Sequence, residues 1–224
     1  MAGDPDEFAE IALKMHDEDS LDETAERLLE YSLKAVSCSY AGVIFVHGGK
    51  RVETVVATHP IVEVLDQIQL DHGEGPDIDV LSDVVSIMVS DTTTESRWPD
   101  WGKRVAEVGI RSLLSVRLYT STDTVGTLNL YDVEPNHFDV DDQAVAHILA
   151  RHAAIALANA RSNEQLRQAI DARKLIGQAQ GILMERFDLN ADQAFAVLLR
   201  YSQDYNVKLR LVAERLIATR VLPS

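Results

Sequence analysis

The sequence predicts an α+β domain, an antiparallel sheet with flanking helices, joined by a long helix to an all-α three-helix bundle. Short apolar stretches separated by turn residues fill the N-terminal part, which is typical of antiparallel strands between helices. From Asp141 to Ile176 the chain has no Pro or Gly, as a continuous helix requires. Apolar residues then recur at helical spacing in three segments up to Ile217.

Helices of the N-terminal part are predicted at residues 21–36, 61–70 and 98–108. The first carries apolar residues at helical spacing, and Asp22 and Glu23 suit the positive end of its dipole. The third is entered through a proline, which fits the first helical position.

Strands are predicted at residues 41–46, 51–57, 84–89, 111–119 and 125–131. Gly48-Gly49 supplies the positive φ that a tight hairpin needs between the first two. The last two pair antiparallel across a Ser-Thr-Asp turn. Residues 1–20 are polar, and we expect them to be flexible.

The bundle begins where Gly177 and Gly181 lie one helical turn apart in the long helix. Each mid-helix glycine costs about 1 kcal/mol relative to Ala, so two on one face indicate close approach to the backbone. We expect the core side to hold Leu175, Ile176, Ala179, Ile182, Leu183 and Phe187. The exposed side then carries Arg173, Lys174, Gly177, Gln178, Gln180, Gly181 and Met184.

Two further helices complete the bundle. Asn190 and Gln193 form a capping box for the second, and Asn206 is placed to cap the third. The predicted apolar arcs are Ala194, Phe195, Val197, Leu198 and Tyr201 in one helix, and Leu209, Val212, Ala213 and Leu216 in the other. Three helices in so short a segment share a small core.

This C-terminal part resembles an ANTAR domain. The resemblance rests on the run Ile176-Gly-Gln-Ala-Gln-Gly-Ile-Leu-Met-Glu-Arg186, on Ala194-Phe195, and on the stretch from Tyr201-Ser202 through Asn206-Val-Lys-Leu-Arg-Leu-Val-Ala213. It implies a three-helix output module of bacterial regulators that binds paired RNA stem-loops in leader transcripts and favours antitermination. The family often has Lys or Arg where this chain has Gln180, which weakens a charge contact there.

The N-terminal part resembles a GAF domain. The matching segments are Arg97-Trp98-Pro99, Gly109-Ile-Arg-Ser-Leu-Leu-Ser115, Val125-Gly-Thr-Leu-Asn-Leu-Tyr131, Phe138-Asp-Val-Asp-Asp142 and His152-Ala-Ala-Ile-Ala-Leu-Ala-Asn-Ala160. The resemblance implies a sensory or dimerisation domain that binds a small molecule or cofactor between its sheet and helices. We therefore expect a flexible N-terminus at 1–20, a GAF-like domain at 21–160 and an ANTAR domain at 161–224.

The sequence leaves the ligand and any cofactor unknown. The Asn-Lys-x-Phe-Asp motif of cyclic-nucleotide GAF domains is missing, and Cys38, expected to be a small buried hydrophobe, ends the first helix rather than lying in the pocket region where a bilin attaches. Related domains often have Cys soon after Gly-Pro, where this chain has Gly75-Pro76-Asp77. Haem needs a buried axial His, whereas His59, His72 and His137 look like loop residues.

No catalytic or metal-binding constellation is recognisable, so we predict that the protein is not an enzyme. Its carboxylates occur in runs at helix starts, such as residues 139–142, where they favour the helix dipole. A single cysteine excludes an intramolecular disulfide and a Cys-cluster metal site. His147 and His152 are too far apart around a helix to share a metal.

The net charge of −15 divides unevenly along the chain. Residues 161–224 hold 10 basic and 7 acidic residues, net +3, whereas residues 1–160 hold 11 and 29, net −18. Because the acidic part repels phosphate, RNA contact is expected in the C-terminal module. No apolar stretch is long enough to cross a membrane, and the acidic N-terminus is unlike a signal peptide, so we expect a cytoplasmic protein with no membrane partner.

The long helix carries a seven-residue apolar repeat through Ile148, Ile155, Ala169, Ile176 and Leu183, broken only by Ser162. Sustained heptads favour a parallel coiled coil and hence a homodimer, while a helix packed within one chain is the alternative. The candidate dimerisation residues are Ile148, Ile155, Leu166 and Ala169.

The predicted function is transcription antitermination through RNA stem-loops, controlled by the GAF-like domain. The candidate RNA-binding residues are Arg173, Gln178, Gln180, Gly181, Met184, Arg186, Arg200, Ser202, Asn206, Lys208 and Arg210. For Gly181 the alternative is close packing of another helix of the bundle or of a dimer partner. A DNA-binding regulator and a small-molecule sensor with protein contact as its output are the alternatives for the whole chain.

Overall fold

The computed structural model describes residues 10, 13–15, 20–47, 51–82 and 84–221. It divides into two compact units, Met1–Arg161 and Ser162–Ser224, which are described separately. Most of the predicted flexible segment 1–20 and the predicted Gly48-Gly49 turn lie outside the described residues.

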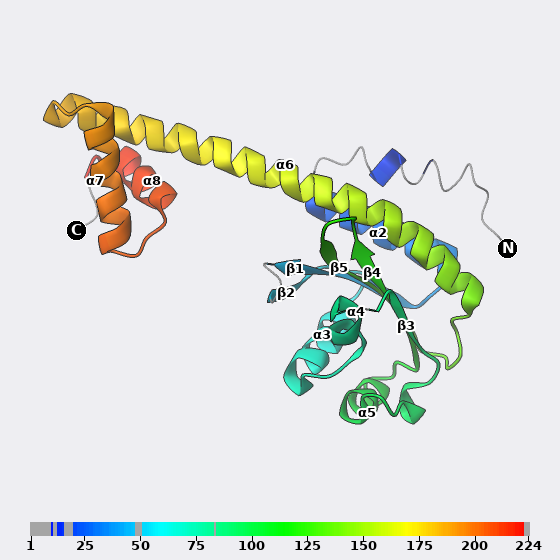
Figure 1. Cartoon of the computed structure of the whole chain (residues 1–224). Coiled ribbons are helices and arrows are strands. Elements are labelled where there is room, and N and C mark those ends of the chain that lie inside the picture. The colour runs from blue at the N-terminus through cyan, green and yellow to red at the C-terminus, as the bar shows by residue number, and fades with distance from the viewer. Residues whose placement is uncertain (1–9, 11–12, 16–19, 48–50, 83, 222–224) are drawn as a thin grey trace. The chain divides into compact units, whose positions relative to one another are not determined.

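The first unit contains a five-stranded antiparallel sheet in the order β2-β1-β5-β4-β3 (Figure 1). The strands are β1 Tyr40–His47, β2 Arg51–Ala57, β3 Ser86–Val89, β4 Ser112–Tyr119 and β5 Thr124–Asp132. All five predicted strands are confirmed. The edge strand β3 is short and its pairing ends at Ser86 opposite Val116, so β4 continues beyond it.

The helices are α2 Leu21–Val36, α3 Pro60–His72, α4 Pro76–Ser82, α5 Pro99–Glu107, α6 Val140–Phe187, α7 Ala191–Asp204 and α8 Leu209–Thr219, with a 3₁₀ turn at Thr92–Thr94. The sequence did not predict α4 or the 3₁₀ turn, because such short helices show no apolar repeat. Since His72 ends α3, its prediction as a loop residue was wrong.

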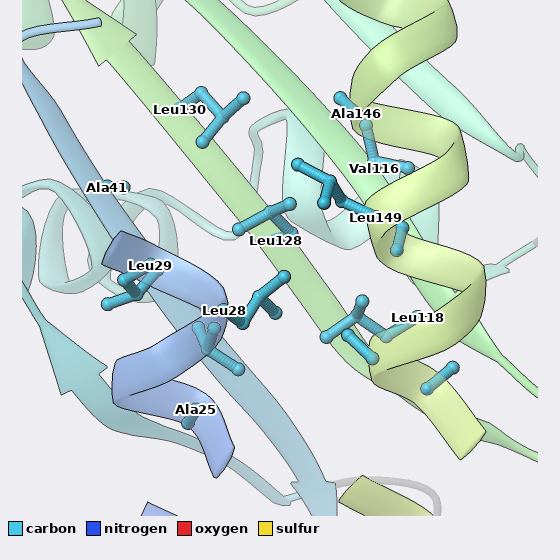
Figure 2. Packing of buried hydrophobic residues seen from close by; sticks show 14 of the residues in the cluster. Ala25, Leu28, Leu29, Ala41, Val116, Leu118, Leu128, Leu130, Ala146 and Leu149 are labelled. Atoms are coloured by element: carbon cyan, nitrogen blue, oxygen red, sulfur yellow. The ribbon is translucent and has the colours of Figure 1, made fainter. Parts of the chain in front are cut away.

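Side chains alternate between the two faces along each strand, and both faces of the sheet are buried. On one face, Leu28 of α2 and Leu149 of α6 pack against Leu128 and Leu130 of β5 (Figure 2). Tyr131, the neighbour of Leu130, points to the opposite face, where a second core contains residues of α3, α4 and α5. Two buried layers around one sheet confirm the predicted α+β class.

The helix α6 is continuous over 48 residues, as the absence of Pro and Gly before Gly177 predicted. Asp139 begins it by accepting hydrogen bonds from the backbone N–H groups of Asp141 and Asp142, at 2.8 and 2.9 Å. These acids therefore stabilise a helix start, as predicted. No helix in the described part of the chain is long and apolar enough to cross a membrane.

The second unit is the predicted three-helix bundle, formed by the C-terminal turns of α6 with α7 and α8. Its buried core consists of Ala179, Leu183, Ala194, Leu198, Val212, Ala213 and Leu216. The Asn190–Gln193 capping box at the start of α7 is confirmed.

Three predictions for the bundle were wrong. Phe187 and Phe195 were assigned to the core, but they are 54% and 38% exposed. Phe187 is the last residue of α6, and Asp188 follows with φ of 51°, so the helix ends before its ring reaches the core. Asn206 does not cap α8: it has φ of 49° in the connecting turn, and Lys208 occupies the cap position.

Candidate RNA interface and ligand pocket

The two glycines of α6 lie on a bare part of the bundle surface. No atom outside the helix lies within 4 Å of the position that a Cβ on Gly177 or Gly181 would occupy, among the residues described. Arg173 and Gln178 are exposed on the same helix, and Met184 is 36% exposed. Close packing of another helix of the same bundle therefore does not explain these glycines, so that alternative was wrong within one chain.

The remaining candidate RNA-binding residues differ in whether they already have a hydrogen-bond or ion-pair partner within the bundle. Gln180 is half-buried and donates from Nε2 to the carbonyl oxygen of Ala191 at 3.1 Å, which joins α6 to α7. The Ser202 hydroxyl donates to the carbonyl oxygen of Val207 at 2.7 Å and so stabilises the α7–α8 turn. These two polar groups have structural partners, whereas Asn206 is exposed in that turn.

Among the basic candidates, three have partners in the bundle. Arg200 lies 3.5 Å from Asp204 and Arg210 lies 2.6 Å from Glu214 (N to O). Arg186 donates to the carbonyl oxygen of Arg220 at 2.6 Å. In the described part of the unit, Arg173 and Lys208 form no ion pair and remain exposed, so they are the basic candidates with unused charge.

This unit also has exposed aromatic rings, which were not predicted from the sequence. Tyr205 is 50% exposed, and its ring stacks on Tyr201 at 5.8 Å with an angle of 14° between the planes. Phe187 is also exposed, beside the guanidinium of Arg186. Rings with an open face are the groups on which unpaired RNA bases stack. The i, i+4 spacing of Tyr201 and Tyr205 is the feature of the sequence that could have indicated stacked rings on one face of a helix.

The four candidate dimerisation residues are all exposed on α6. Ile148, Ile155 and Leu166 are 42%, 56% and 61% exposed, and Ala169 is exposed as well. The heptad does not extend to Leu183, because that side chain is buried in the core of its own bundle. Within the part of the chain that the structure describes, these side chains therefore form an exposed apolar stripe that ends before the bundle begins.

A small hollow lies in the first unit between α3, α4 and the sheet. Its cavity volume is about 40 Å³, and it is lined by Ile44, Asp66, Gln69, Leu70, Asp77, Ile78 and Leu81. Apolar walls with a few polar groups are typical of small-molecule sites, although those are usually larger. The hollow opens beside Leu70 and Ile78, which are 52% and 38% exposed.

Asp77 is the centre of a buried polar network at this hollow. Its carboxylate accepts hydrogen bonds from Gln69 Nε2 at 2.5 Å, Ser115 Oγ at 2.9 Å and Asn129 Nδ2 at 2.9 Å. Burial raises the pKa of Asp77, while these donors act in the opposite direction. From the sequence, this position is notable only because it lacks a cysteine, since no sequence pattern indicates that three neutral donors converge on it.

Cys38 is buried, as predicted, and burial raises the pKa of its thiol to about 12, so it is a poor nucleophile. His59 accepts from the backbone N–H of Ile61 and caps α3. Among the described residues, no cluster of three or more His, Cys, Asp or Glu is placed to hold a metal.

Solved structures similar to this chain include a GAF domain and two other bacterial proteins. The GAF domain of a phosphoenolpyruvate-protein phosphotransferase from Coxiella burnetii is 17% identical with a TM-score of 0.59, over 70% of this chain and 94% of that one. A two-component sensor histidine kinase domain from Sinorhizobium meliloti is 18% identical with a TM-score of 0.56, over 67% and 99%. Free methionine-R-sulfoxide reductase from Neisseria meningitidis is 14% identical with a TM-score of 0.55, over 69% and 88%. At these identities the likeness shows the fold alone.

No curated protein matches the chain. The family models match it in two places: the model of the GAF domain over residues 18–158, and that of the ANTAR domain over residues 164–217. The first match covers more than half of the chain and coincides with the sheet and its helices, and the second coincides with the bundle. The chain belongs to the GAF domain family and carries a C-terminal ANTAR domain.

Proposed function

We propose that this protein is a transcription antitermination regulator that binds paired RNA stem-loops through its ANTAR domain, under the control of its GAF domain. The bare arc around Gly177 and Gly181 carries the proposal most directly, since it costs helix stability and no residue described in this chain packs on it. The net charge of +3 over residues 161–224 supports a phosphate-rich partner.

The proposed mode of action has three parts. A small molecule binds the GAF domain, two chains associate through the apolar stripe of α6, and the two ANTAR domains of the dimer bind the paired loops. Two copies of one module match two loops by symmetry, which is why we connect the dimer to a paired target. In this role the protein performs no catalysis, and it acts on transcripts in the cytoplasm.

The test is fluorescence anisotropy with the full chain at near-physiological salt. The labelled ligands are an RNA with two tandem stem-loops, the same RNA with one loop deleted, and a duplex DNA of equal charge. We expect the two-loop RNA to bind most tightly. Equal binding of the duplex DNA supports the DNA-binding alternative, and no binding of any nucleic acid supports an output through protein contact.

Cross-linking and sequencing of bound transcripts identifies the natural target. The result that supports the proposal is enrichment of leader regions with two nearby stem-loops upstream of a terminator. Enrichment of coding regions without such loops contradicts it.

A further inference from the structure

The turn that follows α7 presents an aromatic ring to solvent. Tyr205, the first residue after α7, is 50% exposed. The ring of Tyr201, one helical turn earlier, stacks against one of its faces, with 5.8 Å between the ring centres and 14° between the ring planes. Among the residues that the structure describes, Tyr205 has no other ring or cation over it. The face of Tyr205 that points away from Tyr201 is therefore open.

Hydrogen bonds within the turn fix the backbone that carries this ring. The N–H of Tyr205 donates to the carbonyl oxygen of Tyr201 at 3.2 Å. Ser202 and Val207 are joined twice: the Val207 N–H donates to the Ser202 carbonyl oxygen at 3.0 Å, and the Ser202 hydroxyl donates to the Val207 carbonyl oxygen at 2.7 Å. The open face is thus held in place before a ligand arrives, so stacking on it costs little conformational entropy.

The fold of the bundle does not require an aromatic residue at position 205. Tyr201 packs against the bundle core, whereas Tyr205 belongs neither to that core nor to the side chains packed against it. Its neighbours in the turn, Asp204 and Asn206, are exposed and polar. The centre of a protein–protein interface is depleted of charged residues, so this setting is unlike one. A ligand with a flat ring and polar edges fits the site better than an apolar protein surface does.

The charges near the ring favour an anionic ligand. Residues 200–210 hold three basic residues and one acidic residue. The acidic residue, Asp204, lies 3.5 Å from Arg200 (N to O), which offsets its charge. Lys208 is exposed and forms no ion pair in the part of the chain that the structure describes. An open ring and an unpaired cation three residues apart match the two components of unpaired nucleic acid, a base that stacks and a phosphate that carries charge.

We propose that the open face of Tyr205 stacks on one unpaired base in a loop of the RNA, and that Lys208 contacts a phosphate beside that base. The inference rests on the proposed function, which makes a stem-loop the ligand, and it assigns the residue that receives a loop base. Bases within a stem are already stacked and paired, so this contact selects for an unpaired nucleotide. Because every base has a flat face, the ring itself reads the unpaired state rather than the identity of the base.

The first experiment measures binding of the full chain to the two-loop RNA by fluorescence anisotropy at several salt concentrations. Tyr205→Leu keeps an apolar side chain but removes the ring, and we expect it to weaken binding roughly tenfold, as the loss of one base–ring stack does. Tyr205→Phe keeps the ring and should bind within about twofold of the unaltered protein. Lys208→Gln should lower the slope of log affinity against log salt by about one, whereas Tyr205→Leu should leave that slope unchanged.

The second experiment identifies the base that stacks. Each RNA of a set lacks the base at one position of both loops but keeps the sugar and the phosphate. We expect one of these RNAs to bind the unaltered protein roughly tenfold more weakly than the intact RNA, and to bind Tyr205→Leu as tightly as the intact RNA does. Phe195→Leu removes a ring that is 38% exposed on the same helix, and as the control it should bind every RNA as the unaltered protein does.

Melting temperatures show that each variant is folded. If folded Tyr205→Leu binds the intact RNA as tightly as the unaltered protein, or if Tyr205→Phe loses as much affinity as Tyr205→Leu, the inference is wrong while the proposed function stands. If Tyr205→Leu turns a dimer into a monomer without a change in RNA affinity, the ring belongs to a protein interface instead. If no loop base contributes to binding by the unaltered protein, the inference is overturned whatever the variants do. If the unaltered protein binds none of the RNAs, the proposed function fails and the inference fails with it.

Discussion

Gly181 is an unfavourable residue within a helix, and the position that its Cβ would occupy faces open space. Since nothing lies within 4 Å of its Cβ position, Gly181→Ala should stabilise the bundle by up to about 1 kcal/mol. If RNA approaches this arc, Gly181→Leu should keep the helix and weaken stem-loop binding by steric exclusion. Melting temperature and RNA anisotropy on the same two proteins measure both effects.

The matched control is Gln168→Leu, an exposed change on α6 outside the glycine arc, which should leave RNA affinity unchanged. If Gly181→Leu is less stable but binds RNA normally, Gly181 belongs to a packing interface with a second chain instead.

The burial of Asp77 should make the stability of the folded protein depend on pH. Burial raises its pKa in the folded state above the ordinary value of 3.8. Its contribution to stability is therefore fully present below about pH 4 and is lost as the pH rises through the raised pKa. Relative to the unaltered protein, Asp77→Asn should be least stable at low pH and should recover as the pH increases. Urea unfolding between pH 4 and pH 8 measures this trend.

Asp71→Asn serves as the control for that series, because Asp71 is exposed at the end of α3. A constant difference in stability between Asp77→Asn and the unaltered protein at every pH shows that Asp77 has the same charge in the folded and unfolded states.

At the scale of elements, the apolar stripe of α6 should hold two chains together. Ile155 is 56% exposed, so Ile155→Lys leaves the fold of one chain intact but inserts a charge into the predicted dimer interface. We expect light scattering to show a dimer for the unaltered protein and a monomer for the variant. Val133→Lys, an equally apolar exposed position outside α6, should remain dimeric. If light scattering shows that the unaltered protein is a monomer, the predicted coiled coil does not form.

Long elements were predictable because their patterns are local. The spacing of apolar residues predicted a helix at residues 21–36, which are its observed bounds. The absence of Pro and Gly before Gly177 predicted that α6 is continuous. The placement of Phe187 and Phe195 failed because periodicity assigns a face to a side chain but does not show where the core ends. The polar network at Asp77 depends on residues distant in sequence that only the sheet brings together, such as Asp77 and Asn129.

Across the whole molecule, the opposite charges of the two parts should govern RNA affinity. The fragment 161–224 has a net charge of +3, whereas residues 1–160 have −18. At low salt the fragment should bind RNA more tightly than the full chain, and both affinities should fall as salt increases. The difference should shrink as salt screens the repulsion. If the two proteins show equal affinity at low salt, the acidic part does not influence RNA binding.

The core of the bundle has a thermodynamic consequence. Three of its seven buried residues are alanines, so Ala179, Ala194 and Ala213 contribute little apolar area compared with the leucines of the sheet domain. We therefore expect the bundle to open at a lower free energy than the central strands of the first unit, and its amides to exchange with solvent before theirs. A ligand that binds only the closed bundle raises that free energy by mass action. RNA would then be part of what keeps its own binding surface folded.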